Sequence, residues 1–349
     1  MSGLRTGWTT GTCASAAAKA AAVALVSGVA PAEVEVALPG GRRVPFAVET
    51  EGPATCVVVK DAGDDPDCTD GARMTATASW SAPGGKGARL LAGPGVGTIT
   101  LPGLGLPVGA PAINPVPRRV ILAALAEVVD RPLDICFSVP GGEAMAEKTS
   151  NRRLGIVGGI SILGTSGIVR PFSTAAYRAS VVQQVDVAAA QGETHMVLAT
   201  GSRSERAAER LLPGLRGVCV VEVGDFTGVC LRRVAERRMT AATFVGMAGK
   251  IAKLAAGVMM THFHRSQVDT ALLGEVAASA GAPAHVVAAA TETHTARHFA
   301  EVCVASGDVE PLAALCRRAA EACRRHVGGA LAVEVIMVDF EGERMIARG

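Results

Sequence analysis

The second half of the sequence alternates short apolar runs with segments of helical spacing, and this constrains the fold most strongly. The runs predict strands at residues 195–199, 218–223 and 241–245, with helices at 202–212, 228–237 and 248–257. Strands that alternate with helices indicate βαβ units and a parallel sheet. We also expect a helix over 173–191, a strand over 331–338, and a terminal strand at 345–348 that pairs back on it.

The first half of the sequence shows a different order of expected elements, with several strands in succession and few helices. An alanine-rich segment at 12–26 predicts a helix that stops at Gly28. Strands are expected at residues 33–38, 44–50, 56–60, 73–80 and 133–139, and a second helix at 118–129. Residues 84–117 are rich in glycine and proline and predict an ordered loop region. The fold class is therefore α/β: an α+β domain over 1–145, then a mostly parallel α/β domain over 146–349.

Composition excludes several classes of protein. The formal net charge is only +2 and aromatic residues make up 3%, so we expect no nucleic-acid partner. The nine cysteines are odd in number and form no CxxC pair, which indicates buried thiols in a reducing compartment. His262 with His264, and His294 with His298, lack a third ligand, so no protein-bound metal is expected.

The segment GWTTGTCASAAAKAA (7–21) opens the chain. A signal peptide is disfavoured because Lys19 and three threonines interrupt the apolar stretch, and no apolar run is long enough to span a membrane. We therefore expect a cytoplasmic protein without a membrane partner. Thr9, Thr10 and Thr12 stand at a helix start, where capping needs one hydroxyl; the surplus predicts an anion cradle. We interpret Cys13 as a packing residue rather than a nucleophile.

Four further stretches suggest binding chemistry. GIVGGISILGTSGIV (155–169) could bring backbone N–H groups close to a ligand, although tight strand packing explains its glycines equally well. ATGSRSERAAER (199–210) reads as a strand, a turn and a helix start, which is either an anion site or a plain βα turn. Arginines in AINPVPRR (112–119) and TSNRRLG (149–155) suit a substrate with carboxylates, or form surface salt bridges. KDAGDDPD (60–67) holds aspartates that act as a base, or cap a solvated turn.

Taken together, these stretches resemble the CbiD family. The stretches are GWTTGTCASAAAKAA, VKDAGDDPDCTDGA, GVGTITLPGLGLPVGAPAINPVPR, NRRLGIVGGISILGTSGIVRPFS and GKIAKLAAGVMMTH, in that order, within residues 4–270. The resemblance implies methylation of ring carbon C1 of cobalt-precorrin-5B in cobalamin biosynthesis. It implies S-adenosylmethionine as donor and an acid-rich tetrapyrrole as substrate, with cobalt carried by the substrate.

Candidate residues follow from that chemistry. A carboxylate base that removes a ring proton is expected among three residues, Asp61, Asp64 and Asp65. Donor-binding candidates are Gly158, Gly159, Thr165, Ser166, Thr200, Gly201, Ser202 and Asp225, the last for the ribose hydroxyls. Substrate-binding candidates are Thr9, Thr10, Thr12, Asn114, Arg118, Arg152, Arg153 and Lys250.

This chain also departs from the pattern that the resemblance leads us to expect. Trp8 stands where tyrosine is commoner, Gly224-Asp225-Phe226 replaces Ser-Asn-Phe, and Met247-Ala248 replaces a Gly-His pair before Gly249-Lys250. Two other functions stay open: a nucleotide-dependent oxidoreductase, although the full glycine fingerprint is absent, and a tetrapyrrole carrier without activity. A homodimer is a further expectation.

Overall fold

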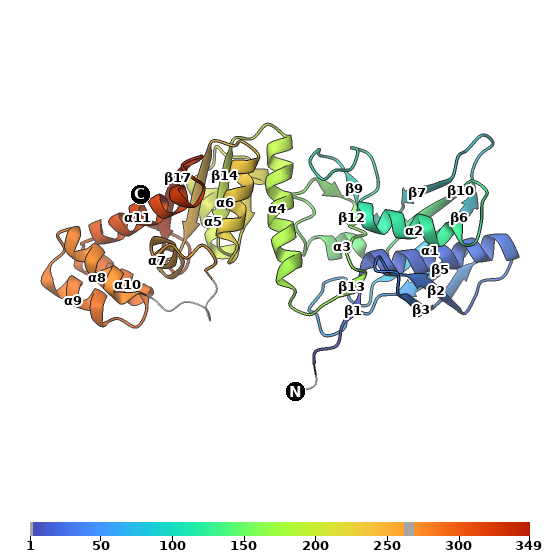
Figure 1. The fold of residues 1–349 in the computed structure, drawn as a ribbon, viewed down its shortest axis with the longest axis horizontal. Coiled ribbons are helices and arrows are strands. Elements are labelled where there is room, and N and C mark those ends of the chain that lie inside the picture. The colour runs from blue at the N-terminus through green and yellow to red at the C-terminus, as the bar shows by residue number, and fades with distance from the viewer. Residues whose placement is uncertain (1–2, 262–268) are drawn as a thin grey trace. The chain divides into compact units, whose positions relative to one another are not determined.

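A computed structural model describes residues 3–261 and 269–349 of the chain. The chain forms two compact units, Met1–Thr174 and Ala175–Gly349, coloured blue to green and green to red in Figure 1. The units divide later in the chain than the expected boundary at 145/146. The difference has a physical reason: three short strands between residues 156 and 169 pair with earlier strands of unit 1.

Unit 1 is built on a five-stranded sheet in the order β4-β5-β6-β10-β7. The strands are β4 (Glu49–Gly52), β5 (Thr55–Val59), β6 (Arg73–Trp80), β10 (Leu133–Ser138) and β7 (Ala88–Ala92). Neighbours are antiparallel except β10 and β7, which are parallel. The strand expected at 44–50 is two strands, β3 (Arg43–Ala47) and β4, and β7 lies in the region expected to be a loop.

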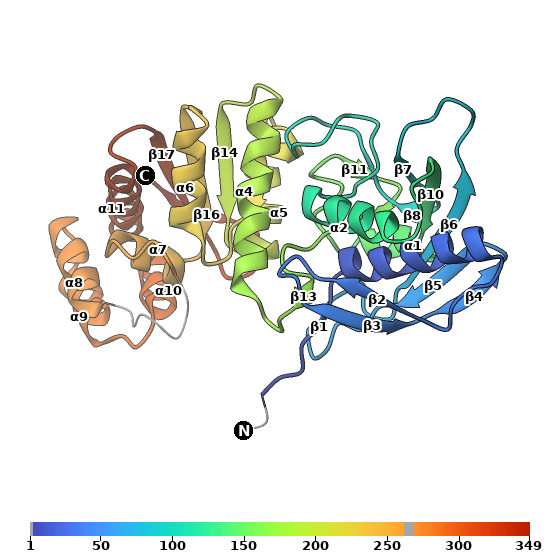
Figure 2. The same ribbon diagram turned by 45° about the vertical axis from the view of Figure 1, so that its right-hand side comes forward.

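Helix α1 (Thr10–Ser27) lies on this sheet beside α2 (Pro115–Ala126), with the hairpin of β2 (Glu33–Ala37) and β3 next to it (Figure 2). Its alanines are buried on nearly every side, because small side chains let the sheet and α2 approach closely. The helix ends at Gly28, which takes φ 77° as the C-cap, as expected. By length and apolarity α1 would suit a membrane span, but 72% of it is buried within the fold, as in a core helix.

Three short strand pairs tie the glycine-rich segment back to unit 1. β12 (Gly159–Ile160) pairs with β8 (Gly95–Val96), β11 (Ile156–Val157) with β9 (Thr98–Ile99), and β13 (Ile168–Val169) with β1 (Gly7–Trp8). A short helix, α3 (Gly142–Ala146), precedes them. The segment at 155–169 is therefore part of the core of unit 1.

Unit 2 contains the predicted parallel sheet, in the order β15-β14-β16-β17-β18. Its strands are β14 (His195–Ala199), β15 (Val220–Glu222), β16 (Ala241–Gly246), β17 (Ala332–Val338) and β18 (Met345–Arg348). The first four run parallel, and β18 pairs antiparallel with β17 as the expected hairpin. A 3-10 turn, Gly217–Cys219, occupies the start of the expected strand at 218–223.

Helices cover both faces of the unit 2 sheet. The predicted helices are α4 (Thr174–Ala190), α5 (Ser202–Leu211), α6 (Thr227–Glu236) and α7 (Ala248–Ala255). Side chains alternate along each strand: Val197 and Val245 pack with α5, whereas Leu198 and Phe244 pack in the core with α4, α6 and α7. No helix was expected from the sequence at α8 (Thr270–Ser279), α9 (Ala284–Glu292) or α11 (Glu310–His326). His294 and His298 were expected on one helix, but only His298 lies in α10 (Ala296–Ser306), and His294 precedes it.

Candidate functional site

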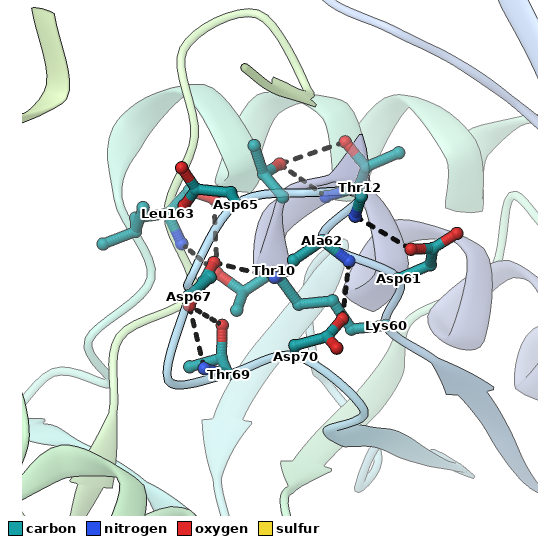
Figure 3. Close-up of polar contacts among 12 residues, drawn as sticks. Thr10, Thr12, Lys60, Asp61, Ala62, Asp65, Asp67, Thr69, Asp70 and Leu163 are labelled. Carbon is teal, nitrogen blue, oxygen red and sulfur yellow. Dashed lines mark hydrogen bonds and ion pairs between the residues drawn. The ribbon is translucent and has the colours of Figure 1, made fainter. Parts of the chain in front are cut away.

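The threonine turn at the start of α1 holds the glycine-rich segment. Thr10 Oγ1 accepts the Leu163 N–H at 2.9 Å (Figure 3). It also lies 3.1 Å from the Ser161 carbonyl oxygen. Thr12 Oγ1 donates to the Gly167 carbonyl at 2.8 Å, and Thr9 Oγ1 caps the helix by accepting the Thr12 N–H. One hydroxyl therefore caps the helix, and the other two bind a segment about 150 residues away.

These contacts account for the surplus of hydroxyls within the protein itself. Thr9, Thr10 and Thr12 are at most 8% exposed. Cys13 is fully buried behind them, and burial raises the pKa of its thiol to about 12, which suits a packing residue. Binding of the substrate by these threonines stays a prediction, and the interactions seen so far are structural.

The glycines of the segment are required by close packing at several points. A Cβ on Gly159 would lie 2.1 Å from the Gly95 backbone, and one on Gly164 would lie 2.4 Å from Thr9 Oγ1. Gly158, in contrast, is exposed with open space beside it, although its φ is +91°. Tight packing thus explains Gly159 and Gly164, while Gly158 remains open to a ligand.

The tip of this segment is exposed. Thr165 and Ser166 both lie at the surface, and Ser166 Oγ is 3.2 Å from the Ile168 carbonyl in a local turn. All four donor-site candidates from this segment belong to unit 1, whereas those at 200–202 and 225 belong to unit 2.

The acidic loop after β5 is anchored by a buried lysine. Lys60 has no exposed side-chain surface and its Nζ lies 2.8 Å from Asp67 Oδ2. Asp67 Oδ1 also accepts the N–H and hydroxyl of Thr69 (Figure 3). Burial opposes ionisation of Asp67, but the Lys60 ammonium and the Thr69 donors outweigh it and lower its pKa. Sequence reasoning missed this pair, because a single Lys before an acidic run looks like a solvated residue.

The three aspartates proposed as bases each contact another part of unit 1. Arg5 forms an ion pair with Asp61, and the Arg5 N–H donates to Asp64 at 2.6 Å. The Arg5 contact, helped by the Gly63 N–H, lowers the pKa of Asp61. Asp65 Oδ1 accepts the Phe172 N–H at 2.7 Å. Arg5 was not among the predicted site residues, because nothing in its local sequence marks it.

The other predicted substrate-binding residues of unit 1 are an asparagine and three arginines, of which two are exposed. Asn114 is the N-cap of α2, but its side chain makes no capping hydrogen bond, and Arg118 is exposed one turn later. Arg152 is exposed and Arg153 half-buried. Their neighbour Asn151, which was not predicted, is buried and donates to the Gly159 carbonyl at 3.0 Å, so it braces the glycine-rich segment.

In unit 2 the candidates gather at the carboxyl ends of the parallel strands. The connection after β14 leads to β15 on one side, and the connection after β16 leads to β17 on the other. The order of the strands therefore reverses between β14 and β16, and open α/β sheets bind ligands beyond the strand ends at such a reversal. Thr200 and Gly201 lie at this point, with both N–H groups donating to Ser204 Oγ, and exposed Ser202 begins α5.

Two other candidates contact each other at the same edge. Asp225, just beyond β15, forms an ion pair with Lys250 of α7, and Thr261 Oγ1 lies 3.1 Å from Lys250 Nζ. A predicted donor ligand and a predicted substrate ligand are thus partners. Asp225 Oδ2 has no hydrogen bond within the described part of unit 2, and nearby Thr227 carries a fully buried hydroxyl without a partner.

The remaining titratable residues suggest no metal site in the described ranges, 3–261 and 269–349. No group of three or more His, Cys, Asp or Glu side chains there is placed to hold a metal ion. His262 and His264 lie outside the described residues. All nine cysteines are free thiols, and seven of them are buried.

Comparison with known proteins gives a consistent result across the chain. The CbiD family model matches residues 1–171, and the model for the CbiD C-terminal domain matches residues 260–349. Proteins named cobalt-precorrin-5B C(1)-methyltransferase are close in sequence. The one from Salinispora arenicola is 60% identical over 99% of this chain and 92% of its own length. Those from Rubrobacter xylanophilus and Thermus thermophilus are 60% and 46% identical, over 97% and 99% of this chain and 89% and 94% of theirs.

A solved structure also matches. The cobalamin biosynthesis protein (cbiD) from Archaeoglobus fulgidus is 28% identical, with a TM-score of 0.42 over 75% of this chain and 83% of that one. The sequence identities, which extend over nearly the full length of both chains, carry the assignment: this chain belongs to the CbiD family.

Proposed function

We propose that this protein transfers a methyl group from S-adenosylmethionine to C1 of cobalt-precorrin-5B, in the synthesis of cobalamin. The observation that carries the proposal is 60% identity, over 99% of the chain, to an enzyme of that name. The substrate is a tetrapyrrole that brings its own cobalt, so the protein needs no resident metal for this reaction. A cytoplasmic location and a homodimer, expected from the sequence, remain predictions.

The carboxyl edge of the unit 2 sheet fits the donor. The strand order reverses between β14 and β16, and α5 begins just beyond β14, where the N–H groups of a helix start favour a carboxylate. Among the described residues Asp225 Oδ2 receives no hydrogen bond, which suits ribose hydroxyls, and the Thr227 hydroxyl two positions later has no partner there either. We therefore assign Thr200, Gly201, Ser202 and Asp225 to the donor.

Methyl transfer requires the protein to position the donor and the substrate rather than to supply a reactive side chain. When bound, S-adenosylmethionine supplies an electrophilic methyl group on a sulfonium, which needs no protein nucleophile. The task of the protein is to orient the reactants and exclude water, and such orientation supplies a large share of a rate enhancement. Exposed Arg118 and Arg152, with Asn114, suit the carboxylates of the substrate.

A base is still useful for the proton that the ring loses. Asp61 is the least suitable, because its contact with Arg5 lowers its pKa and makes it a weaker proton acceptor. Asp64 is exposed, and only its Oδ2 receives a hydrogen bond in the described structure. We assign the base to Asp64. An Asp64→Asn variant with unchanged kcat and tight substrate binding would rule this out.

A direct assay tests the function. The protein is incubated with cobalt-precorrin-5B and S-adenosylmethionine labelled in its methyl group, and the product is followed by mass spectrometry. A gain of one labelled methyl group supports the proposal. Tight binding of the macrocycle without any gain supports a carrier instead. A parallel incubation with a nicotinamide cofactor in place of S-adenosylmethionine tests the oxidoreductase, which would consume that cofactor.

The donor site has its own test. Calorimetric titration should show donor binding weakened about 10- to 150-fold for Asp225→Ala, since a lost charge-assisted hydrogen bond contributes about 1.5–3 kcal/mol. Asp225→Asn, which keeps one acceptor oxygen, should fall in between. Lys250→Met is the matched control, because it removes the ion pair but leaves the carboxylate. Equal affinity for Asp225→Ala and the unmodified protein would reject this assignment.

A further inference from the structure

Phe172 has an unusual backbone and an unusual exposure. Its φ is +56°, a region that large side chains avoid, and its side chain leaves the residue 67% exposed. Arg238 also has positive φ, but it follows the end of α6, where helices commonly adopt this conformation. Phe172 lies in a turn after Pro171, at the position where such turns usually carry Gly or Asn. Strain of this kind persists only when the surroundings impose it.

Asp65 imposes this conformation from the acidic loop. Its Oδ1 accepts the Phe172 N–H at 2.7 Å, across 107 positions of sequence. The acidic loop itself is fixed by Lys60 and Asp67, and the segment before Phe172 is fixed where β13 pairs with β1. The turn is therefore held from both sides, and the apolar ring of Phe172 is exposed to solvent.

We propose that Phe172 is a substrate-binding residue, whose ring stacks on the flat face of the tetrapyrrole, and that Asp65 is a positioning residue acting through it. This inference rests on the proposed function. A tetrapyrrole offers a broad flat face for an aromatic ring and a rim of carboxylates for cations. Exposed Arg170, two positions earlier in the chain, is a cation that suits this rim. The same unit holds the threonine turn and the acidic loop, which together position this segment.

Substitutions of Phe172 test the stacking. Phe172→Leu keeps an apolar side chain but loses the flat ring, so we expect the KM for the macrocycle to rise about tenfold, the effect of one lost stacking contact. The KM for S-adenosylmethionine should not change. Phe172→Asn should raise the KM for the macrocycle by the same factor. Its unfolding temperature should stay the same or rise, because Asn adopts positive φ readily. Phe172→Tyr keeps the ring and should restore the KM.

Substitutions of Asp65 separate positioning from catalysis. Asp65→Ala removes the acceptor of the Phe172 N–H and should raise the KM for the macrocycle. Asp65→Asn retains an acceptor oxygen and should restore that KM. Combining Asp65→Ala with Phe172→Leu should be no worse than Phe172→Leu alone, because both act through one ring. A fall in kcat for Asp65→Asn, with KM unchanged, would overturn the positioning role and make Asp65 the base.

Two outcomes distinguish this inference from the proposed function. If the unmodified protein methylates its substrate but Phe172→Leu has the same KM for the macrocycle, only the inference is wrong. If the unmodified protein does not methylate, binding decides: the absorbance of cobyrinic acid, a cobalt corrinoid with free carboxylates, is followed in titrations with both proteins. Weaker binding by Phe172→Leu then supports the inference, and equal binding overturns it.

A change of oligomeric state in Phe172→Leu, seen by sedimentation at unchanged KM, also overturns it in favour of a contact between copies.

Discussion

The ammonium of Lys60 lies 2.8 Å from the Asp67 carboxylate, and the lysine side chain is fully buried. A charge at that depth is tolerable only with a partner, because an unpaired buried ion loses its hydration without compensation. The pair fixes the far end of the acidic loop, while Arg5 and the Phe172 N–H fix Asp61, Asp64 and Asp65. The loop is thus an ordered part of unit 1.

Asp67→Asn should therefore destabilise the protein strongly. It leaves the Lys60 ammonium buried without a counter-charge, at a cost of about 3–5 kcal/mol. Urea denaturation should show a lower midpoint with the same slope. The control is Lys60→Met with Asp67→Leu, which removes both charges and should recover much of the loss. Equal midpoints for Asp67→Asn and the unmodified protein would mean that the pair is not buried in solution.

Thr10→Val should loosen the glycine-rich segment. The valine keeps the shape but leaves the part-buried Leu163 N–H without its acceptor, at a cost of about 1 kcal/mol. Hydrogen exchange should become faster at Leu163 and its neighbours. Thr10→Ser retains the hydroxyl and is the matched control. Unaltered exchange in Thr10→Val would show that the hydroxyl does not hold the segment.

Two neighbouring glycines should respond differently to alanine. In Gly159→Ala the new Cβ would lie 2.1 Å from the Gly95 backbone, which forces β8 and β12 apart and should cost more than about 3 kcal/mol. In Gly158→Ala the Cβ meets open space, so only the strain of positive φ remains, about 1–2 kcal/mol. Thermal unfolding of the two variants measures the difference. Similar losses would contradict the close approach of the two strands.

Glu127 should contribute to stability in a defined range of pH. Hydrogen bonds from Arg43 and Lys19 lower its pKa from 4.5 to about 2. A carboxyl whose pKa is depressed by folding stabilises the protein above its unfolded pKa, and that stability disappears as the pH falls from about 4.5 towards 2. The gain is modest, because the side chain is 37% exposed and water screens the pairs. Urea midpoints between pH 6 and pH 3 should fall less steeply for Glu127→Gln, and parallel curves would contradict this.

Much of unit 2 could be predicted from the sequence. Local patterns of apolar residues predict its strands and helices. Examples are the strands at 195–199 and 241–246 and the helix that begins at residue 202. Because these elements alternate, few topologies are possible, and the parallel sheet could be predicted. The edge of the sheet where a ligand is expected could be predicted with it. In unit 1 the same reasoning missed β7 and placed the domain boundary earlier in the chain, because strands of two or five residues carry little periodicity.

The sequence by itself determined the family, the elements of the parallel sheet, and the residue types that suit a carboxylate-rich substrate. Only the tertiary structure decided what those residues contact. Thr10 and Leu163, Lys60 and Asp67, and Asp65 and Phe172 are pairs whose partners local spacing does not reveal. The same hydroxyl or carboxylate can bind a ligand or an N–H group of the protein, and the residue type alone does not distinguish these roles. Its role depends on which donors the fold brings within hydrogen-bonding distance, and long-range packing of the chain decides that.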